Sequence, residues 1–240
     1  MIVTFTDFGI TGPYMGQMKA RLLQYAPCEP IVDLMVDVPA FQIAYGAKLL
    51  AGLVENMPEE AVYLCVVDPG VGGQRKPICL QCAGRWFVGP DNGLFHYIIQ
   101  SSQNVQAFEI LWRGAVLSKS FHGRDLFAPV AAMLAQNIDF DKSAVPVDDL
   151  VTLSAKVAGE VIYIDGYGNC WTDIRHNDIA TSETLKIGIQ TLKYADVFCD
   201  TEEGHAFWYF NSSGFVEIAI NQGNAAQIFG LMLGSQVNRN

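Results

Sequence analysis

Val66-Val67-Asp68-Pro69-Gly70-Val71-Gly72-Gly73-Gln74-Arg75 is the stretch that indicates the fold, because it ends an apolar run and turns at once into a glycine-rich loop. The run itself, Ala61–Val67, is apolar throughout, which is typical of a strand buried on both faces of a parallel sheet. In open α/β sheets, ligands bind outside the carboxyl ends of the strands. We therefore expect an α/β fold with a binding site beside Asp68.

Strand and helix patterns alternate along the first half of the chain. Pro13 suits the first turn of a helix, and the apolar residues of Ala40–Val54 recur at helical spacing. Such alternation predicts a mainly parallel sheet with helices packed on it. The expected elements are strands over Ile2–Thr6, Pro30–Met35, Ala61–Val67, Pro77–Cys82, Arg85–Val88 and Val105–Leu111, and helices over 13–26, Ala40–Val54, a segment ending at Ile99, and Leu126–Ala135.

The composition changes after Asn137. Asp139–Asp149 is polar and contains proline, so it predicts a linker. Short alternating runs separated by turns follow, a pattern typical of a small β-barrel or β-sandwich. These runs are Val157–Ile164, Cys170–Ile174, Leu185–Ile189, Ala206–Phe210 and Phe215–Ile220. We therefore expect an α/β domain over residues 1–150 and an all-β domain over residues 151–240.

The composition excludes several classes of protein. Half of the 240 residues are apolar and 17% are charged, which permits a substantial core and argues against disorder. The net charge of −10 comes without a basic cluster, so nucleic acid is not an expected partner. No apolar run approaches the roughly 18 residues of a membrane helix, and Met1–Asp7 lacks the basic region of a signal peptide. We expect a cytoplasmic protein with no membrane partner.

The sequence has no clear site for a metal or a nucleotide cofactor. Cys79 and Cys82 form a C-x-x-C, but no second pair or histidine stands at zinc-ligand spacing. The cysteines lie in apolar surroundings, which indicates reduced thiols. Neither the G-x-G-x-x-G motif nor a Walker loop occurs, which argues against dinucleotides and triphosphates. We expect no metal and no cofactor.

Asp68, Arg75 and His122 are the first candidate site residues. An Arg beside an Asp stabilises the charged carboxylate and makes it a weaker base, so the pair suits positioning a nucleophile or complementing a cationic ligand. His122 lies between Phe121 and Gly123 just before a helix, where it can orient a group or accept a proton near neutral pH. The structural alternatives are an ordinary turn with a surface Arg, and a structural histidine.

Two acidic turns are the next candidates. Asp7 follows the first strand, where a carboxylate can hold a ribose diol or cap a helix. Asp165-Gly166-Tyr167-Gly168-Asn169 separates two expected strands of the second domain. It is either a simple hairpin turn or a binding loop, in which Asp165 meets an ammonium group, Asn169 meets an amide-like edge and Tyr167 stacks on a base.

Seven motifs follow one another along nearly the whole chain. They are Thr6-Asp7-Phe8-Gly9, Tyr14-Met15-Gly16-Gln17-Met18-Lys19, Val66-Val67-Asp68-Pro69-Gly70-Val71-Gly72 with Arg75, Gly89-Pro90-Asp91-Asn92-Gly93, Phe121-His122-Gly123-Arg124-Asp125-Leu126-Phe127-Ala128-Pro129, Asp165-Gly166-Tyr167-Gly168-Asn169 and Asn221-Gln222-Gly223. Each motif is weak alone, but the ordered set is specific. It resembles the S-adenosyl-L-methionine hydroxide adenosyltransferases, which are relatives of fluorinase and chlorinase.

The resemblance implies a fold, an assembly and a reaction. It implies a Rossmann-like N-terminal domain, a β-barrel C-terminal domain and a homotrimer that binds S-adenosyl-L-methionine between one subunit's N-terminal domain and its neighbour's C-terminal domain. The reaction is S-adenosyl-L-methionine plus water giving adenosine and L-methionine, with no cofactor. Hydrolases of the family have an Asp–Arg–His set that Asp68, Arg75 and His122 match, whereas halogenating relatives lack it.

The resemblance also implies substrate contacts. The expected substrate-binding residues are Asp7, Phe8, Phe121, Asp165, Tyr167, Asn169, Ser212 and Asn221. Among them, Asp7 would hold the ribose hydroxyls, and the backbone around Asn221 would read the adenine edge. The methionine and nucleoside polar groups would meet Asp165, Asn169 and Ser212.

In the implied reaction the sulfur leaves as a neutral thioether, so no general acid is needed. The barrier lies in the weak nucleophile, and holding water at roughly 3–3.5 Å from the 5′ carbon removes several kcal/mol. Asp68 or His122 accepts the water proton, and the residue pattern leaves both open. The alternatives are a halogenase forming 5′-halo-5′-deoxyadenosine and a non-catalytic adenosyl-ligand binding protein. Gly12 stands where the family often has an acid, and Ser120 where Thr is usual. These departures bear on the details of methionine-end recognition more than on the expected reaction.

Overall fold

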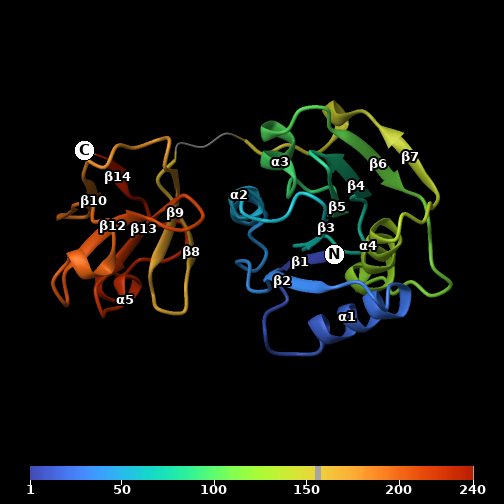
Figure 1. The fold of residues 1–240 in the computed structure, drawn as a ribbon, viewed down its shortest axis with the longest axis horizontal. Coiled ribbons are helices and arrows are strands. Elements are labelled where there is room, and N and C mark those ends of the chain that lie inside the picture. The colour runs from blue at the N-terminus through green and yellow to red at the C-terminus, as the bar shows by residue number, and fades with distance from the viewer. Residues whose placement is uncertain (155–157, 240) are drawn as a thin grey trace. The chain divides into compact units, whose positions relative to one another are not determined.

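The computed structural model describes residues 1–154 and 158–239, which form two compact units, Met1–Leu153 and Ser154–Asn240 (Figure 1). The first unit contains one seven-stranded sheet, in the order β2-β1-β3-β5-β4-β6-β7. Its strands are β1 (Ile2–Thr6), β2 (Ile31–Met35), β3 (Val62–Val66), β4 (Pro77–Cys82), β5 (Arg85–Pro90), β6 (Gln106–Ile110) and β7 (Lys142–Val145). This order places β1 and β3 side by side.

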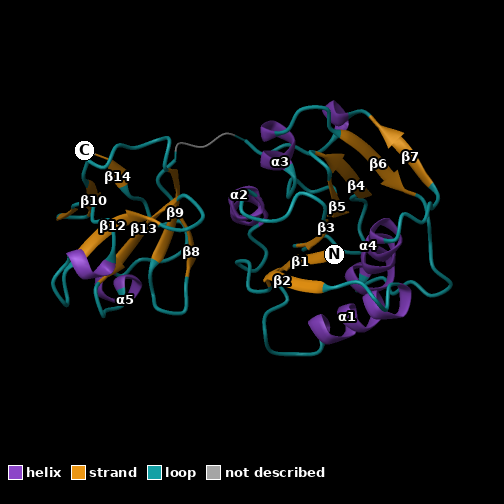
Figure 2. Cartoon of the chain, viewed as in Figure 1, coloured by secondary structure: helices purple, strands orange, loops and turns teal. Residues whose placement is uncertain are grey.

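Helices pack on both faces of this sheet (Figure 2). They are α1 (Tyr14–Tyr25), α2 (Ile43–Val54), α3 (His96–Ser101) and α4 (Ala128–Ala135), with a π-helical turn η1 (Gly123–Phe127) and a 3-10 turn η2 (Val147–Asp149). Leu64 and Val66 of β3 share a core with α1 and α4, whereas Val67 lies against Gly46 of α2. Every residue of β3 is buried, which explains the unbroken apolar run in the sequence.

The sheet is mixed and not mainly parallel. The β1–β2, β1–β3 and β3–β5 pairs are parallel, whereas β4–β5, β4–β6 and β6–β7 are antiparallel. The change begins at the two-residue connection Ala83-Gly84, whose φ angles of 48° and 76° are those of a tight hairpin turn. Strands joined by so short a connection must run antiparallel, so the strand–helix alternation ends at β3.

The prediction of a linker over Asp139–Asp149 is wrong, because this segment forms β7 and η2. Within the sheet, β7 pairs only with β6 and is therefore an edge strand. Its polar residues Lys142 and Ser143 suit that place, since charged side chains at an edge discourage pairing with another chain. Polar composition alone did not distinguish an edge strand from a linker.

Cys79 and Cys82 lie on opposite faces of β4, because side chains three residues apart along a strand point in opposite directions. Both are buried free thiols, and burial raises the pKa of Cys79 to about 12. The C-x-x-C therefore belongs to a strand and is not a chelating loop. Residues 1–154 and 158–239 contain no group of three His, Cys, Asp or Glu side chains able to bind a metal.

The second unit consists of antiparallel strands in two sheets. The four-stranded sheet has the order β12-β13-β9-β8, and the three-stranded sheet has the order β11-β10-β14. Its elements are β8 (Val161–Ile164), β9 (Cys170–Arg175), β10 (Leu185–Ile187), β11 (Gln190–Leu192), η3 (Phe198–Asp200), β12 (Ala206–Phe210), β13 (Phe215–Ile220), α5 (Ala225–Phe229) and β14 (Asn238–Arg239). Their closure into a barrel stays a prediction. The strand expected from Val157 begins at Val161, and Val157 lies outside the described residues.

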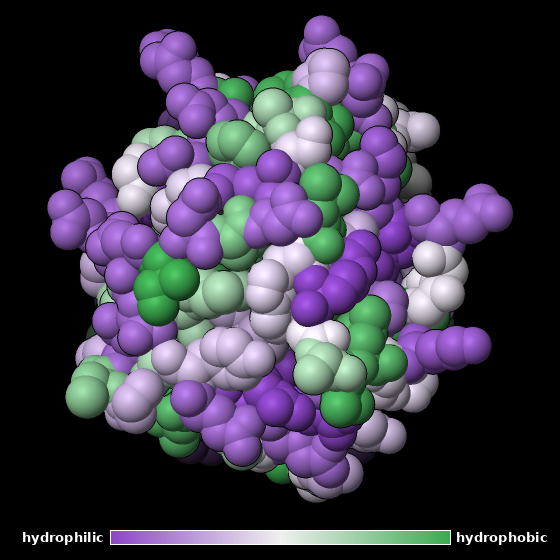
Figure 3. All heavy atoms as spheres, turned by 90° about the vertical axis from the view of Figure 1, so that its right-hand side faces the viewer, coloured by the Kyte–Doolittle hydropathy of each residue, from purple (hydrophilic) through white to green (hydrophobic). Residues whose placement is uncertain are grey.

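The described part of the chain contains no helix with the length and apolarity needed to span a membrane. Figure 3 shows the face that forms the right-hand side of Figure 1, where hydrophobic residues are scattered among hydrophilic ones. Scattered apolar side chains are ordinary on a protein surface.

Leu22 and Leu23 offer a matched test of how α1 packs. Leu22 is fully buried in the core shared by α1, α4 and the sheet, whereas 47% of Leu23 is exposed. We expect Leu22→Ala to lower the free energy of unfolding by about 2–5 kcal/mol, because it removes buried methyl groups and leaves a cavity. Leu23→Ala should change it by less than about 0.5 kcal/mol. Urea unfolding at one protein concentration measures both, and equal losses would contradict this orientation of α1.

Candidate functional site

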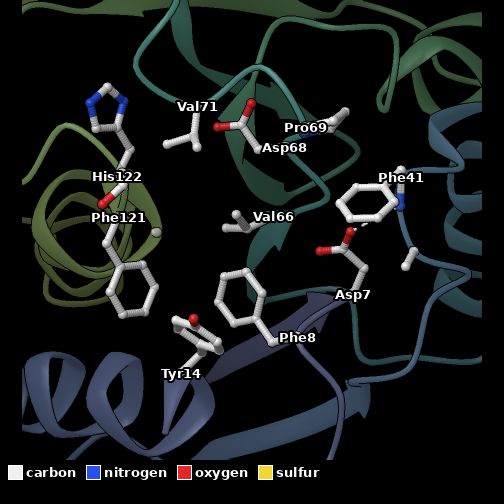
Figure 4. Close-up of a pocket in the computed structure, with 13 residues that line it drawn as sticks. Asp7, Phe8, Tyr14, Phe41, Val66, Asp68, Pro69, Val71, Phe121 and His122 are labelled. Atoms are coloured by element: carbon white, nitrogen blue, oxygen red, sulfur yellow. Dashed lines mark hydrogen bonds between the residues drawn. The ribbon is translucent and has the colours of Figure 1, made fainter. Parts of the chain in front are cut away.

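A cavity of about 360 Å³ lies in the first unit, at the carboxyl ends of β1 and β3 (Figure 4). Asp7 and Asp68 both reach it, because each closely follows one of these adjacent parallel strands. This edge of the sheet is where α/β folds bind ligands. The residues that line the cavity are Asp7, Phe8, Tyr14, Ala40, Phe41, Val66, Asp68, Pro69, Val71, Ser120, Phe121, His122 and Gly123.

Arg75 joins Asp68 to His122 through one guanidinium group. Its Nε donates to Oδ1 and Oδ2 of Asp68 at 3.1 and 3.0 Å, and its Nη2 donates to Oδ2 at 2.5 Å. The same Nη2 lies 2.8 Å from Nδ1 of His122. Only 4% of the Asp68 side chain and 10% of the Arg75 side chain are exposed, so both charges are largely shielded from water.

The contact with Arg75 determines which nitrogen of His122 holds a proton. A guanidinium has only donors, so Nδ1 must accept the hydrogen bond and the proton lies on Nε2. Burial lowers the pKa of His122 and the Arg75 charge lowers it further, against the opposing effect of Asp68, so the ring is neutral near pH 7. His122 can therefore donate a hydrogen bond through Nε2.

Two glycines allow the segments around these contacts to approach closely. Gly72, in the loop after β3, has a φ of 78°, and a Cβ there would overlap the carbonyl oxygen of Lys119. That loop therefore packs directly on the segment before η1. Gly123 faces the aromatic side of the cavity, where a Cβ would lie 3.1 Å from Cζ of Phe8. A side chain at either position would push the segments apart.

The π-helical turn η1 directly follows His122. The N–H of Ala128 donates to the carbonyl oxygen of Gly123, five residues back, where an α-helix would use the fourth. Such turns are rare and often lie at functional sites. The turn leads into α4, which is buried over nearly its whole length, so Phe121 and His122 stand beside an element held firmly by the core (Figure 4).

Phe8, Tyr14 and Phe121 form one wall of the cavity (Figure 4). Their ring centroids lie 6.0 Å apart for Phe8 and Tyr14, 5.8 Å for Phe8 and Phe121, and 5.5 Å for Tyr14 and Phe121. Phe121 meets both other rings edge to face, a favoured aromatic geometry. An apolar wall beside two carboxylates suits a ligand with apolar, hydroxyl and cationic parts.

Asp7 is held by the loop before α2, because its Oδ2 accepts the N–H of Phe41 at 3.2 Å. Burial raises the pKa of Asp7, and this hydrogen bond partly opposes the shift. Phe41 has a φ of 65°, an uncommon left-handed conformation for a bulky residue, and its side chain lies at the cavity with 73% exposed. The sequence analysis missed Phe41, because no local pattern marks a left-handed residue that is not glycine.

The remaining predicted site residues lie in the second unit. Asp165 closes the hairpin turn, since its Oδ1 accepts the N–H groups of Tyr167 and Asn169 at 2.9 Å and its Oδ2 accepts Nδ2 of Asn169 at 3.1 Å. Ser212 lies in the turn between β12 and β13. Nδ2 of Asn221 donates at 2.7 Å to the carbonyl oxygen just after η3. The side chains of Asp165, Asn169 and Asn221 thus take part in the local structure of their turns.

The predicted residues divide between two hollows. Those that line the cavity of the first unit are Asp7, Phe8, Asp68, Phe121 and His122, with Arg75 behind Asp68. A hollow of about 380 Å³ in the second unit is lined by Tyr167, Asn169, Phe198, Ile220, Gln222, Gly223 and Asn224. The predicted residues that line neither hollow are Arg75, Asp165, Ser212 and Asn221.

The fold and the site define a class of protein with two units, a mixed sheet, and a cavity lined by a carboxylate and an imidazole that one arginine bridges from behind. The sequence matches the N-terminal domain of the SAM hydroxide adenosyltransferases over residues 2–144 and their C-terminal domain over residues 159–238. The chain belongs to the SAM hydroxide adenosyltransferase family.

Relatives resemble the chain over almost its full length. It is 34% identical to the (R)-S-adenosyl-L-methionine hydrolase of Thermus thermophilus, over 97% of this chain and 96% of that protein. It is 24% identical to the fluorinase of Nocardia brasiliensis, over 99% of this chain and 95% of that protein. The crystal structure of an uncharacterized conserved protein from Thermotoga maritima has a TM-score of 0.88 and 30% identity, covering 100% of this chain and 99% of that chain.

The pKa of His122 is expected to respond to Arg75. Arg75→Gln removes a neighbouring positive charge, so the depressed pKa of His122 should rise toward its ordinary value of 6.5. NMR titration of protein labelled with 15N-histidine measures it, with His122→Gln used for assignment. Lys19→Gln removes a surface charge outside the cavity and should leave the titration unchanged. An unchanged His122 pKa in Arg75→Gln would contradict the role of the guanidinium.

Proposed function

We propose that this protein hydrolyses S-adenosyl-L-methionine to adenosine and L-methionine. The observation that supports the proposal most strongly is the set of contacts joining Asp68, Arg75 and His122 at the cavity. It offers one proton acceptor and one hydrogen-bond donor to a small nucleophile. The relative named as a hydrolase of this substrate is also more similar to the chain than the fluorinase is, at 34% against 24% identity.

The chemistry needs help at the nucleophile and not at the leaving group. The water oxygen attacks the ribose 5′ carbon as the C–S bond breaks, and the sulfur keeps the bonding pair as a neutral thioether. His122 orients the water by donating from Nε2, Asp68 accepts the proton that the water loses and passes it to solvent, and Arg75 fixes both groups. Holding the reacting atoms in this way lowers the barrier by pre-organisation.

The cavity of the first unit takes the ribose in this proposal. Asp7 holds the ribose hydroxyls, and Phe8 and Phe121 pack against the apolar surface of the substrate. The two oxygens of the Asp7 carboxylate can accept hydrogen bonds from two hydroxyl donors. The thioether chain then extends along the aromatic wall.

The second unit supplies the remaining contacts of the proposal. Its contributing residues are Asp165, Tyr167, Asn169, Ser212 and Asn221. They contact the methionine end and the nucleoside from a neighbouring subunit of a homotrimer, as the family resemblance implies. The proposal also includes a Rossmann-like domain over residues 1–150 and a β-barrel over residues 151–240. It further includes a cytoplasmic location, no metal or cofactor, and no nucleic acid partner.

Incubation with S-adenosyl-L-methionine is expected to release adenosine and L-methionine in equal amounts. Chromatography of the products, in buffer with and without chloride or fluoride, measures this. The Asp68 carboxylate should repel a halide, so added halide should leave the product unchanged. Formation of 5′-halo-5′-deoxyadenosine would make the protein a halogenase, and tight binding without turnover in calorimetry would make it a binding protein.

Asp68→Asn is expected to lower kcat by at least about 100-fold, because it removes the proton acceptor while keeping the size of the side chain. Asp33→Asn is the matched control. Asp33 also pairs with a cation, Lys19 at 2.5 Å, but it lies on β2 outside the cavity. Steady-state kinetics of adenosine release should show wild-type kcat for Asp33→Asn. Full activity of Asp68→Asn would show that Asp68 is not the acceptor.

A further inference from the structure

Asp125 is a buried carboxylate close to the site that has no part in the proposed mechanism. Its side chain is fully buried, and it does not line the cavity. It lies in η1, three residues after His122. A buried carboxylate is unfavourable unless it is paired and hydrogen-bonded, so its partners indicate what it holds in place.

Donors from three segments converge on the Asp125 carboxylate. Nε and Nη2 of Arg124 form a fork to Oδ1 and Oδ2, both at 2.7 Å. The N–H of Ser118 donates to Oδ2 at 3.0 Å, and Nη2 of Arg21 on α1 donates to Oδ1 at 3.4 Å. Arg124 is the main cause that lowers the pKa of Asp125 below its ordinary range. The group is therefore an anion that ties three segments together at neutral pH.

The hydrogen bond from Ser118 closes the segment that contains Phe121 and His122 into a loop. Phe121 donates its N–H to the carbonyl oxygen of Ser118 at 3.4 Å, and Asp125 donates its own N–H to the carbonyl oxygen of Phe121 at 3.2 Å. The two ends of the segment 118–125 are thus joined to each other by the hydrogen bond from Ser118 to the Asp125 carboxylate. The loop after β3 packs on the middle of this segment, where Gly72 meets Lys119.

Arg124 extends the same network to the aromatic wall. Its guanidinium lies over the ring of Phe121, 5.0 Å from the centroid, and its Nη1 donates to Oε1 of Gln17 on α1 at 2.8 Å. The Phe121 ring is one side of the cavity (Figure 4). By binding Arg124, the Asp125 carboxylate therefore helps to hold the Phe121 ring in the cavity wall, in addition to closing the loop at Ser118.

We propose that Asp125 is a positioning residue, which holds residues 118–122 so that His122 keeps its 2.8 Å contact with Arg75. The inference rests on the proposed function, because positioning matters only if His122 orients the attacking water. Asn at this position cannot accept both arms of the Arg124 fork, since one of its two terminal atoms is a donor. The segment that contains His122 would then lose its anchor.

Kinetics of Asp125→Asn test the proposal. We expect kcat to fall by about 10–100-fold, because small displacements of an orienting group have effects of that size. In a His122→Ala background the same substitution should lower kcat less than about threefold, since Asp125 acts through His122. Asp173→Asn is the control, because Asp173 is also buried and accepts two backbone N–H groups, at 2.6 and 2.8 Å, in the second unit. Its kcat should match wild type.

A second variant keeps the proposal testable if Asp125→Asn fails to fold. Arg124→Gln removes the fork at a side chain that is 28% exposed, and it should lower kcat in the same direction. Thermal unfolding of each variant identifies the proteins that remain folded. Equal fold-losses of kcat in the wild-type and His122→Ala backgrounds, or wild-type kcat in both Asp125→Asn and Arg124→Gln, would overturn the proposal.

NMR of 15N-histidine gives a readout that does not depend on catalysis. Wild-type His122 should show an unprotonated Nδ1 and a protonated Nε2, whereas Asp125→Asn should show both tautomers in exchange. The same fixed tautomer in Asp125→Asn and wild type would overturn the positioning role even if the wild-type protein hydrolyses S-adenosyl-L-methionine. A wild-type protein that releases no adenosine would overturn the proposed function, while the comparison of tautomers would still decide whether Asp125 positions His122.

Discussion

A guanidinium shared between a carboxylate and an imidazole is the constraint on which the rest of the site depends. Arg75 donates to both Asp68 and His122, so a change in the position or charge of one of these side chains affects the other. Because a guanidinium only donates, it selects the neutral His122 tautomer with the proton on Nε2. The cavity thus offers a fixed anion and a fixed donor, an arrangement that suits a neutral nucleophile and disfavours an anionic one.

The ion pair between Asp68 and Arg75 is largely shielded from water. A buried pair of charges is favourable only when its geometry is well held. Three features hold it here: the close approach of Gly72 to the neighbouring segment, the anchoring of that segment by Asp125, and the burial of α4. The second unit uses a comparable device. Glu217 on β13 is buried, and it accepts hydrogen bonds from the Tyr209 hydroxyl at 2.6 Å and from Asn211 Nδ2 at 2.9 Å.

Single residues with no repeating sequence pattern around them were the hardest to predict. Burial raises the pKa of Glu217, which lies in a strand with every residue buried. A single Glu among apolar neighbours gives no periodic signal, so the sequence analysis passed over it. Asp125 was named only as part of a motif. Its structural role depends on three donor residues that the fold brings to it from different segments. The sequence analysis also missed Phe41, because no local sequence pattern marks its left-handed backbone conformation in the loop.

The sequence by itself determined the strand–helix order as far as β3, the place of the site beside Asp68, and the family, because buried runs, turn residues and ordered motifs are local properties of the chain. Tertiary structure alone decided the antiparallel half of the sheet, which includes an edge strand that reads as a linker. It also decided the state of His122. The partner of its Nδ1 is 47 residues away in sequence, and only packing brings the two together.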